Sequence, residues 1–242
     1  VPDAESIGWY FNTQTMPLAR EARHTALRDR AATRQAILDN LARLADSEPQ
    51  DVLVVYLAGH GVTVGSQWYF VPTDVPAGLR RDDVIRSGVS GEEIANALMR
   101  AKAQRVLLMV DACKSGAAAS DQTLFDDRKK LVLMARTFGL HVIAAAEKDQ
   151  LAAELPQIGH GAFTYTLLQG LEGKADKNGD ATVSATELGD YVKSVLPDIS
   201  LKHAGELQVP VIYSRGQSFG VFAPAALTAA RAAAKAPSPR KK

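Results

Sequence analysis

The stretch Val106-Leu-Leu-Met-Val-Asp-Ala-Cys-Lys-Ser-Gly116 decides the expected fold and runs into Cys113, the one cysteine of the chain. Its first five residues are apolar without a polar break, which is typical of a parallel strand buried on both faces. We expect this strand to end near Val110. Cys113 would then lie just beyond its carboxyl end, where open α/β sheets hold their ligands and their chemistry.

A second apolar run, Val52 to Ala58, leads into Gly59, His60 and Gly61. If the two strands are neighbours, an imidazole and a thiol face each other across one crevice. A nearby imidazolium lowers the pKa of a thiol, and the thiolate is the nucleophilic form. A lone free cysteine is more often a small buried apolar residue. The Gly-His-Gly sequence favours catalysis, because glycines let a substrate backbone approach and leave N–H groups for an oxyanion.

The two stretches around His60 and Cys113 resemble sequence motifs of a known family. Ala58-Gly-His-Gly61 and Asp111-Ala-Cys-Lys-Ser-Gly116 resemble the histidine and cysteine boxes of caspase-like cysteine peptidases, in particular the bacterial orthocaspase and metacaspase branch. Leu27–Thr33 upstream, and Glu154 with Gly159–Tyr165 downstream, extend the resemblance to residues 24–222. The resemblance implies a three-layer α/β/α sandwich with a mostly parallel sheet and helices on both faces.

The resemblance also implies roles for individual residues. His60 would be the general base and Cys113 the nucleophile of a cysteine endopeptidase, with the backbone N–H groups of Gly61 and Cys113 as the oxyanion hole. Asp111 would line the pocket for the residue before the cleaved bond, where a carboxylate pairs with Arg or Lys and repels acidic side chains. The alternative is that Asp111 caps the turn that follows it.

A second function stays open beside the peptidase. It is a catalytically idle caspase-like module used for interaction or signalling within a larger protein. The two functions differ in whether any peptide is cleaved.

Three regions are expected along the chain. Residues 1–23 are a divergent or truncated amino-terminal segment, residues 24–222 the peptidase domain, and residues 223–242 a disordered tail or linker. The caspase-like fold opens with a strand, which is either missing here or represented in divergent form by Ile7 to Phe11. Because the sequence begins without an initiator methionine or a signal-peptide pattern, we expect a piece of a longer protein.

Apolar periodicity and capping residues predict the remaining elements. We expect helices from Thr33 to about residue 45, from Ser90 to about 103, at 162–171 and at 184–196, strands at 25–27, 68–72, 141–146 and 209–213, and a surface loop at 75–89. The aromatic residues of the strand at 68–72 are expected in the core. His160, in another Gly-His-Gly sequence, directly precedes a helix and is expected to cap or pack against it.

A segment near the carboxyl end has the spacing of an EF-hand loop. Its candidate ligands are Asp176, Asn178, Asp180, Thr182, Ser184 and Glu187, at positions one, three, five, seven, nine and twelve. Two features argue against calcium: position six is Ala181 where the sharp turn favours glycine, and Ser184-Ala-Thr-Glu187 is itself a capping box. Calcium remains a candidate ligand, and the expected chemistry requires no cofactor.

Composition excludes several classes of protein. The chain of 242 residues is 46% hydrophobic and 23% charged, which is ordinary for a globular domain. A formal net charge of +1 gives no reason to expect nucleic-acid or membrane binding, and no apolar run approaches the roughly 18 residues that span a bilayer. The expected partners are a protein or peptide substrate and a fused or associated sensor module, and the expected location is cytoplasmic.

Overall fold

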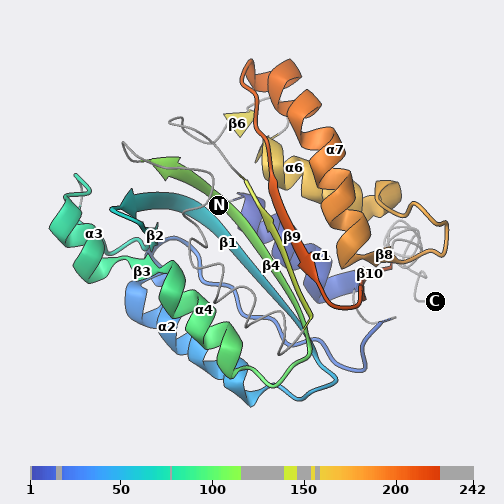
Figure 1. The fold of residues 1–242 in the computed structure, drawn as a ribbon, viewed down its shortest axis with the longest axis horizontal. Helices are drawn as coiled ribbons and strands as arrows, with labels where there is room; N and C mark the ends of the chain where they lie inside the picture. Colours follow the sequence, from blue (N-terminus) through green and yellow to red (C-terminus); the bar gives the residue numbers. More distant parts are fainter. Residues whose placement is uncertain are drawn as a thin grey trace, which may run out of the picture.

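A six-stranded mixed sheet, in the order β3-β2-β1-β4-β5-β9, forms the centre of the protein (Figure 1). The structure, a computed structural model, describes residues 2–14, 18–76, 78–115, 139–145, 154–155 and 159–223. The three central strands run parallel: β1 (Val52–Val64), β4 (Arg105–Ser115) and β5 (Gly139–Ala144). The outer strands pair antiparallel to their neighbours: β2 (Gln67–Val71), β3 (Val89–Ser90) and β9 (Val211–Arg215).

Helices cover both faces of this sheet (Figure 1). One face carries α1 (Pro2–Gln14), α6 (Ala162–Gln169) and α7 (Ala185–Ala204), and the other carries α2 (Arg34–Ala42) and α4 (Gly91–Arg100). The expected α/β/α sandwich is therefore confirmed. Within the described residues, no helix is both long enough and apolar enough to cross a membrane.

The alternation of side chains along β4 divides the core into two clusters. Leu107 and Met109 pack with α1, α6 and α7, while Val106, Leu108 and Val110 pack with α2 and α4. All five side chains are buried, as expected for a strand covered on both faces. Trp68 and Phe70 of β2 also lie in the second cluster, as expected, whereas Tyr69 is only half-buried and belongs to neither cluster.

Smaller elements complete the fold. Short strands pair as β6 (Glu154–Leu155) with β7 (His160–Gly161) and as β8 (Val183–Ser184) with β10 (Gly220–Phe222). Turns of 3-10 helix lie at Asp29–Ala31 and Arg43–Asp46, and a π-helical turn, Gly170–Lys174, follows α6.

The helix starts are where capping chemistry predicts them. The Thr33 hydroxyl accepts a hydrogen bond from the Ala36 N–H at the start of α2. Capping boxes of Ser90 with Glu93 and of Ser184 with Glu187 begin α4 and α7. These side chains satisfy backbone donors that a helix leaves unpaired in its first turn.

Both strands of the candidate site are longer than the sequence predicts. The apolar runs end at Ala58 and Val110, yet β1 continues to Val64 and β4 to Ser115. The reason is that the ladder between the two strands continues past the apolar runs, and pairing keeps the chain extended. Cys113 therefore lies within β4 and His60 within β1, rather than just after them.

Three other expectations are wrong. Ile7 to Phe11 belong to helix α1 and not to a divergent strand, with Ile7 in the core. Thr25–Leu27 form no strand. The expected loop at 75–89 contains α3 (Arg81–Ser87), where acidic residues in the first turn suit the helix dipole and Val84 is fully buried. The expected tail, apart from Ala223, lies outside the described residues.

One partly buried ion pair joins the two helices of the α2 and α4 layer. The Arg34 guanidinium donates to both carboxylate oxygens of Glu93, at 2.7 and 3.2 Å, and to the Gly88 carbonyl at 2.7 Å. Glu93 also caps α4. We expect Glu93→Ala to lower the free energy of unfolding by about 2 kcal/mol, because it removes a cap and a charged hydrogen-bond acceptor.

Urea denaturation measures this loss. The control is Asp190, an exposed acidic residue in the middle of α7, whose replacement by Ala should cost less than about 0.5 kcal/mol. Equal losses for the two variants would contradict the role given to the ion pair.

Candidate active site

The histidine and cysteine boxes lie on adjacent strands and in matching register. β1 and β4 pair in parallel from Val52 opposite Arg105 to Val62 opposite Ser115, and this register sets His60 opposite Cys113. Neighbouring strands are about 5 Å apart. His60 is exposed to solvent, while the side chain of Cys113 lies outside the described part of the structure. The prediction that the two strands are neighbours is confirmed.

Gly59 allows the backbone conformation that precedes His60. Its φ is +154°, which side-chain-bearing residues rarely adopt, and a Cβ at this position would lie 3.2 Å from the Phe70 ring. A side chain at this position would therefore be strained and would crowd the Phe70 ring, which favours glycine. Gly61, the next glycine, pairs with Phe70 on β2 and is in register with Lys114 on β4.

Asp111 is held by the first turn of α6. The Thr164 hydroxyl donates to its carboxylate at 2.5 Å, and the backbone N–H of Thr164 donates to it as well. The Tyr56 hydroxyl lies 2.6 Å from the Thr164 hydroxyl oxygen. Because the Thr164 hydrogen points to the carboxylate, Tyr56 is the donor of this second bond. Asp111 thus binds the first turn of a helix that is distant in sequence, and the turn that would follow it lies outside the described residues.

Asp111 is only 7% exposed, and this burial is the largest influence on its pKa. Loss of solvent raises its pKa from 3.8 to about 6, although the Thr164 hydrogen bonds lower it, and the nearby Asp3 carboxylate raises it further. Burial likewise raises the pKa of Tyr56 well above its ordinary value. Since the folded-state pKa of Asp111 lies above that of the unfolded chain, its contribution to stability is complete below pH 3.8 and is lost as the pH rises through about 6.

Asp3, at the start of α1, is a residue that the sequence did not single out. One of its carboxylate oxygens lies 2.7 Å from Nδ1 of His160, and the other accepts the Gly161 N–H at 3.3 Å. His160 therefore joins α1 to the start of α6, a packing role of the kind expected for it. Asp3 and Asp111 together give this end of the sheet an acidic character.

The side chains of the candidate calcium loop accept hydrogen bonds from the backbone of the loop itself. Carboxylate and amide oxygens of Asp176, Asn178 and Asp180 accept backbone N–H groups of the same loop, at 2.8 to 3.0 Å. Ala181 adopts a φ of +62°, so alanine takes the left-handed conformation for which glycine is favoured. Glu187 accepts from the Ser184 N–H at 3.0 Å as part of the capping box. Within the described residues, no three His, Cys, Asp or Glu side chains converge closely enough to hold a metal.

Comparison with known proteins agrees with this architecture. A family model described as the caspase domain matches residues 3–219. The chain belongs to the caspase domain family. The family is one of cysteine peptidases, so this caspase domain has the scaffold of a cysteine-protease-type hydrolase. Its match begins within α1, in agreement with the packing of that helix into the core.

Solved structures and curated sequences give two further results. The caspase domain is similar in fold to a crystal structure of a protein from Geobacter sulfurreducens, with a TM-score of 0.52 and 17% sequence identity. The similarity covers 89% of this chain and 83% of that one. No curated protein gave a significant match.

The Thr164 hydrogen bond should set the charge state of Asp111 in this caspase domain. We expect Thr164→Val to raise the pKa of Asp111 above its value of about 6, because the carboxylate loses a donor while its burial stays. A titration followed by carbon NMR of the aspartate carboxyls, with Asp111→Asn for assignment, measures this change. Thr164→Ser keeps the hydroxyl and should leave the titration near pH 6, and a Thr164→Val protein that titrates like the parent would refute the role of Thr164.

Proposed function

We propose that this caspase domain is a cysteine endopeptidase with a dyad of His60 and Cys113. The observation that carries the proposal is the register between β1 and β4, which sets the two residues opposite each other. A proton can pass between an imidazole and a thiol only when the groups are within hydrogen-bond reach. Exposure of His60 to solvent also suits a group that must meet a substrate.

In the proposed reaction, His60 accepts the Cys113 proton and the thiolate attacks the carbonyl carbon of the scissile peptide bond. The negative charge that develops on the carbonyl oxygen is bound by the backbone N–H groups of Gly61 and Cys113. When the C–N bond breaks, the imidazolium gives its proton to the leaving amine, and a thioester remains on Cys113. Water, deprotonated by His60, then hydrolyses the thioester to release the acid and restore the thiol.

The proposed specificity is for Arg or Lys before the cleaved bond. Asp111 and Asp3 supply two carboxylates close to each other beside the dyad strands, and the described residues place no Lys or Arg within ion-pair distance of Asp111. Burying a carboxylate without a cation is costly, and a substrate guanidinium would relieve that cost. An acidic substrate side chain would meet repulsion at the same place.

A fluorogenic peptide panel tests the proposed function. Peptides with Arg or Lys before the bond should be cleaved, and a peptide with Asp there should not. We expect Cys113→Ala to abolish cleavage and His60→Ala to lower kcat/KM at least about a thousandfold. Circular dichroism of both variants controls for folding. A folded parent protein that cleaves none of the peptides would favour the idle interaction module, and cleavage that survives Cys113→Ala would remove the cysteine from the mechanism.

We also propose that the loop of residues 176–187 binds calcium, with Asp176, Asn178, Asp180, Thr182 and Glu187 as ligands. The left-handed conformation of Ala181 supports this, because it removes the main objection from the sequence. Binding would require these side chains to turn from backbone N–H groups toward an ion. No step of the proposed reaction depends on it.

Thermal unfolding tests the calcium proposal. Calcium at about 1 mM should raise Tm by at least about 3 °C, since a ligand that binds the folded state stabilises it. Asp176→Ala, which removes the ligand at position one, should remove the effect. Asp190→Ala, an exposed position on α7 outside the loop, is the matched control and should retain it. A Tm that does not respond to calcium in the parent protein would leave Glu187 with its capping role alone.

A further inference from the structure

Tyr56 lies on the same face of the sheet as Asp111, one strand away. The ladder sets Tyr56 opposite Met109 and Ala58 opposite Asp111, so Tyr56 and Asp111 are diagonal neighbours on β1 and β4. Side chains two positions apart point to the same face of a strand, and Tyr56 and Met109 both pack in the cluster beneath α1, α6 and α7. The phenol of Tyr56 therefore points to the side of the sheet on which Asp111 contacts α6.

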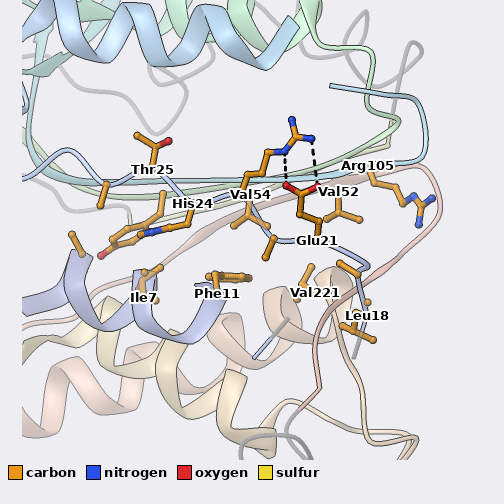
Figure 2. Close-up of a pocket in the computed structure, with 18 of the residues that line it drawn as sticks. Ile7, Phe11, Leu18, Glu21, His24, Thr25, Val52, Val54, Arg105 and Val221 are labelled. Atoms are coloured by element: carbon orange, nitrogen blue, oxygen red, sulfur yellow. Dashed lines mark hydrogen bonds and ion pairs between the residues drawn. The ribbon is translucent and has the colours of Figure 1, made fainter. Parts of the chain in front are cut away.

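The two ends of the Tyr56 side chain have different surroundings. Its ring lines, with Ile7 and Val54, a cavity of about 420 Å³ over the α1 face of β1 (Figure 2). Its hydroxyl is buried beyond the ring, and the loss of solvent there raises the pKa of the phenol well above its ordinary value. Since the ring borders a cavity, packing alone does not fix the side chain, and the hydrogen bond of the neutral hydroxyl does.

This hydroxyl sets the direction of a chain of hydrogen bonds. Tyr56 donates to the Thr164 hydroxyl oxygen, 2.6 Å away, and Thr164 donates to the Asp111 carboxylate at 2.5 Å. The hydroxyl of Thr166, two residues along α6, shows the alternative, because it donates to the Ala162 carbonyl of its own helix at 2.8 Å. A threonine oxygen that accepts the Tyr56 proton gives its own proton to the carboxylate instead.

The charge of Asp111 depends on a balance that these donors shift. Burial and the Asp3 carboxylate disfavour the ionised form, whereas the hydroxyl and backbone N–H of Thr164 and the hydroxyl of Tyr56 favour it. His160 on β7 pairs with Asp3, so the groups that act on Asp111 come from α1, β1 and α6. Because the resulting pKa is about 6, the loss of one donor changes the ionised fraction of Asp111 close to neutral pH.

We propose that Tyr56 is a positioning residue for substrate recognition: through Thr164 it keeps the Asp111 carboxylate ionised and oriented toward the basic side chain of the substrate. This role rests on the proposed function, because it requires Asp111 to bind Arg or Lys before the cleaved bond. Tyr56 acts through the hydrogen-bond chain and takes no part in the reaction at Cys113. Its loss should therefore weaken the binding of basic substrates and leave the chemical steps unchanged.

Peptide binding to the Cys113→Ala protein tests this role without peptidase activity. The probe is tetramethylrhodamine-Gly-Gly-Leu-Arg-Gly-Gly-amide, and the control peptide has citrulline, a neutral isostere, in place of arginine. Fluorescence anisotropy should show that the affinity for the arginine peptide rises at least about fivefold from pH 5 to pH 8, with a midpoint near the Asp111 pKa of about 6. The affinity for the citrulline peptide should change less than about twofold over the same range.

Variants of the same protein locate the effect. Tyr56→Phe removes the hydroxyl and keeps the ring, and it should move the midpoint to higher pH and weaken the arginine peptide at least about threefold at pH 6.5. Thr164→Val breaks the chain at its second member and should act in the same direction. Tyr165→Phe, the same change at an α6 hydroxyl that binds Gln169, is the matched control and should leave the midpoint and the affinity unchanged.

Kinetics of the active protein give a second readout. Tyr56→Phe should raise KM for an arginine peptide at pH 6.5 and leave kcat within about twofold, as expected for a change in binding alone. In the binding experiment, His60→Ala should leave the midpoint unchanged, which separates the titration of Asp111 from that of the imidazole.

Three outcomes decide between the possibilities. A Tyr56→Phe protein with the midpoint and the arginine preference of its parent would overturn the role of Tyr56. Equal binding of the arginine and citrulline peptides at every pH would overturn it together with the basic specificity. A parent protein that binds the arginine peptide with the expected pH dependence and cleaves no peptide would overturn the peptidase and support this role of Tyr56.

Discussion

The parallel pairing of β1 with β4 is the constraint on which the rest of the site depends. Its register sets His60 opposite Cys113 and keeps both strands extended past their apolar runs. A shift of this ladder by one residue would turn every side chain of one strand to the other face, so the two buried clusters also maintain the alignment of His60 with Cys113. Core packing and the proposed catalysis therefore depend on the same hydrogen bonds.

Asp111, two residues before Cys113 on β4, lowers the stability of the fold when it is ionised. With its pKa raised from 3.8 to about 6, ionised Asp111 costs roughly 3 kcal/mol at neutral pH. Thr164 and the start of α6 limit that cost through hydrogen bonds to the carboxylate. A buried carboxylate that no Lys or Arg of the described residues pairs with is unusual where stability alone is selected. Such a carboxylate is expected where a basic ligand pairs with it, as we propose for Arg or Lys of a substrate.

Much of this arrangement could be predicted from sequence, and the failures have identifiable causes. Apolar runs predicted β1 and β4, and capping boxes predicted the starts of α4 and α7, because both signals are local. The predicted ends of β1 and β4 were wrong because the hydrogen-bonded ladder between these strands, and not the apolar run, determines where they end. Thr164, Tyr56 and Asp3 could not be found, since only the fold brings them to Asp111. α3 was missed because one buried side chain, Val84, gives little periodicity. The sensor module and the cytoplasmic location stay predictions.

The most direct measurement of the central claim is the rate of iodoacetamide alkylation against pH, because a chain with one cysteine reports on Cys113 alone. If His60 lies within reach of the thiol, the parent protein should react with an apparent thiol pKa well below the ordinary value of about 8.5, and His60→Ala should return it toward that value. Identical profiles for the two proteins, both near 8.5, would show that the imidazole and the thiol do not interact and would contradict the account.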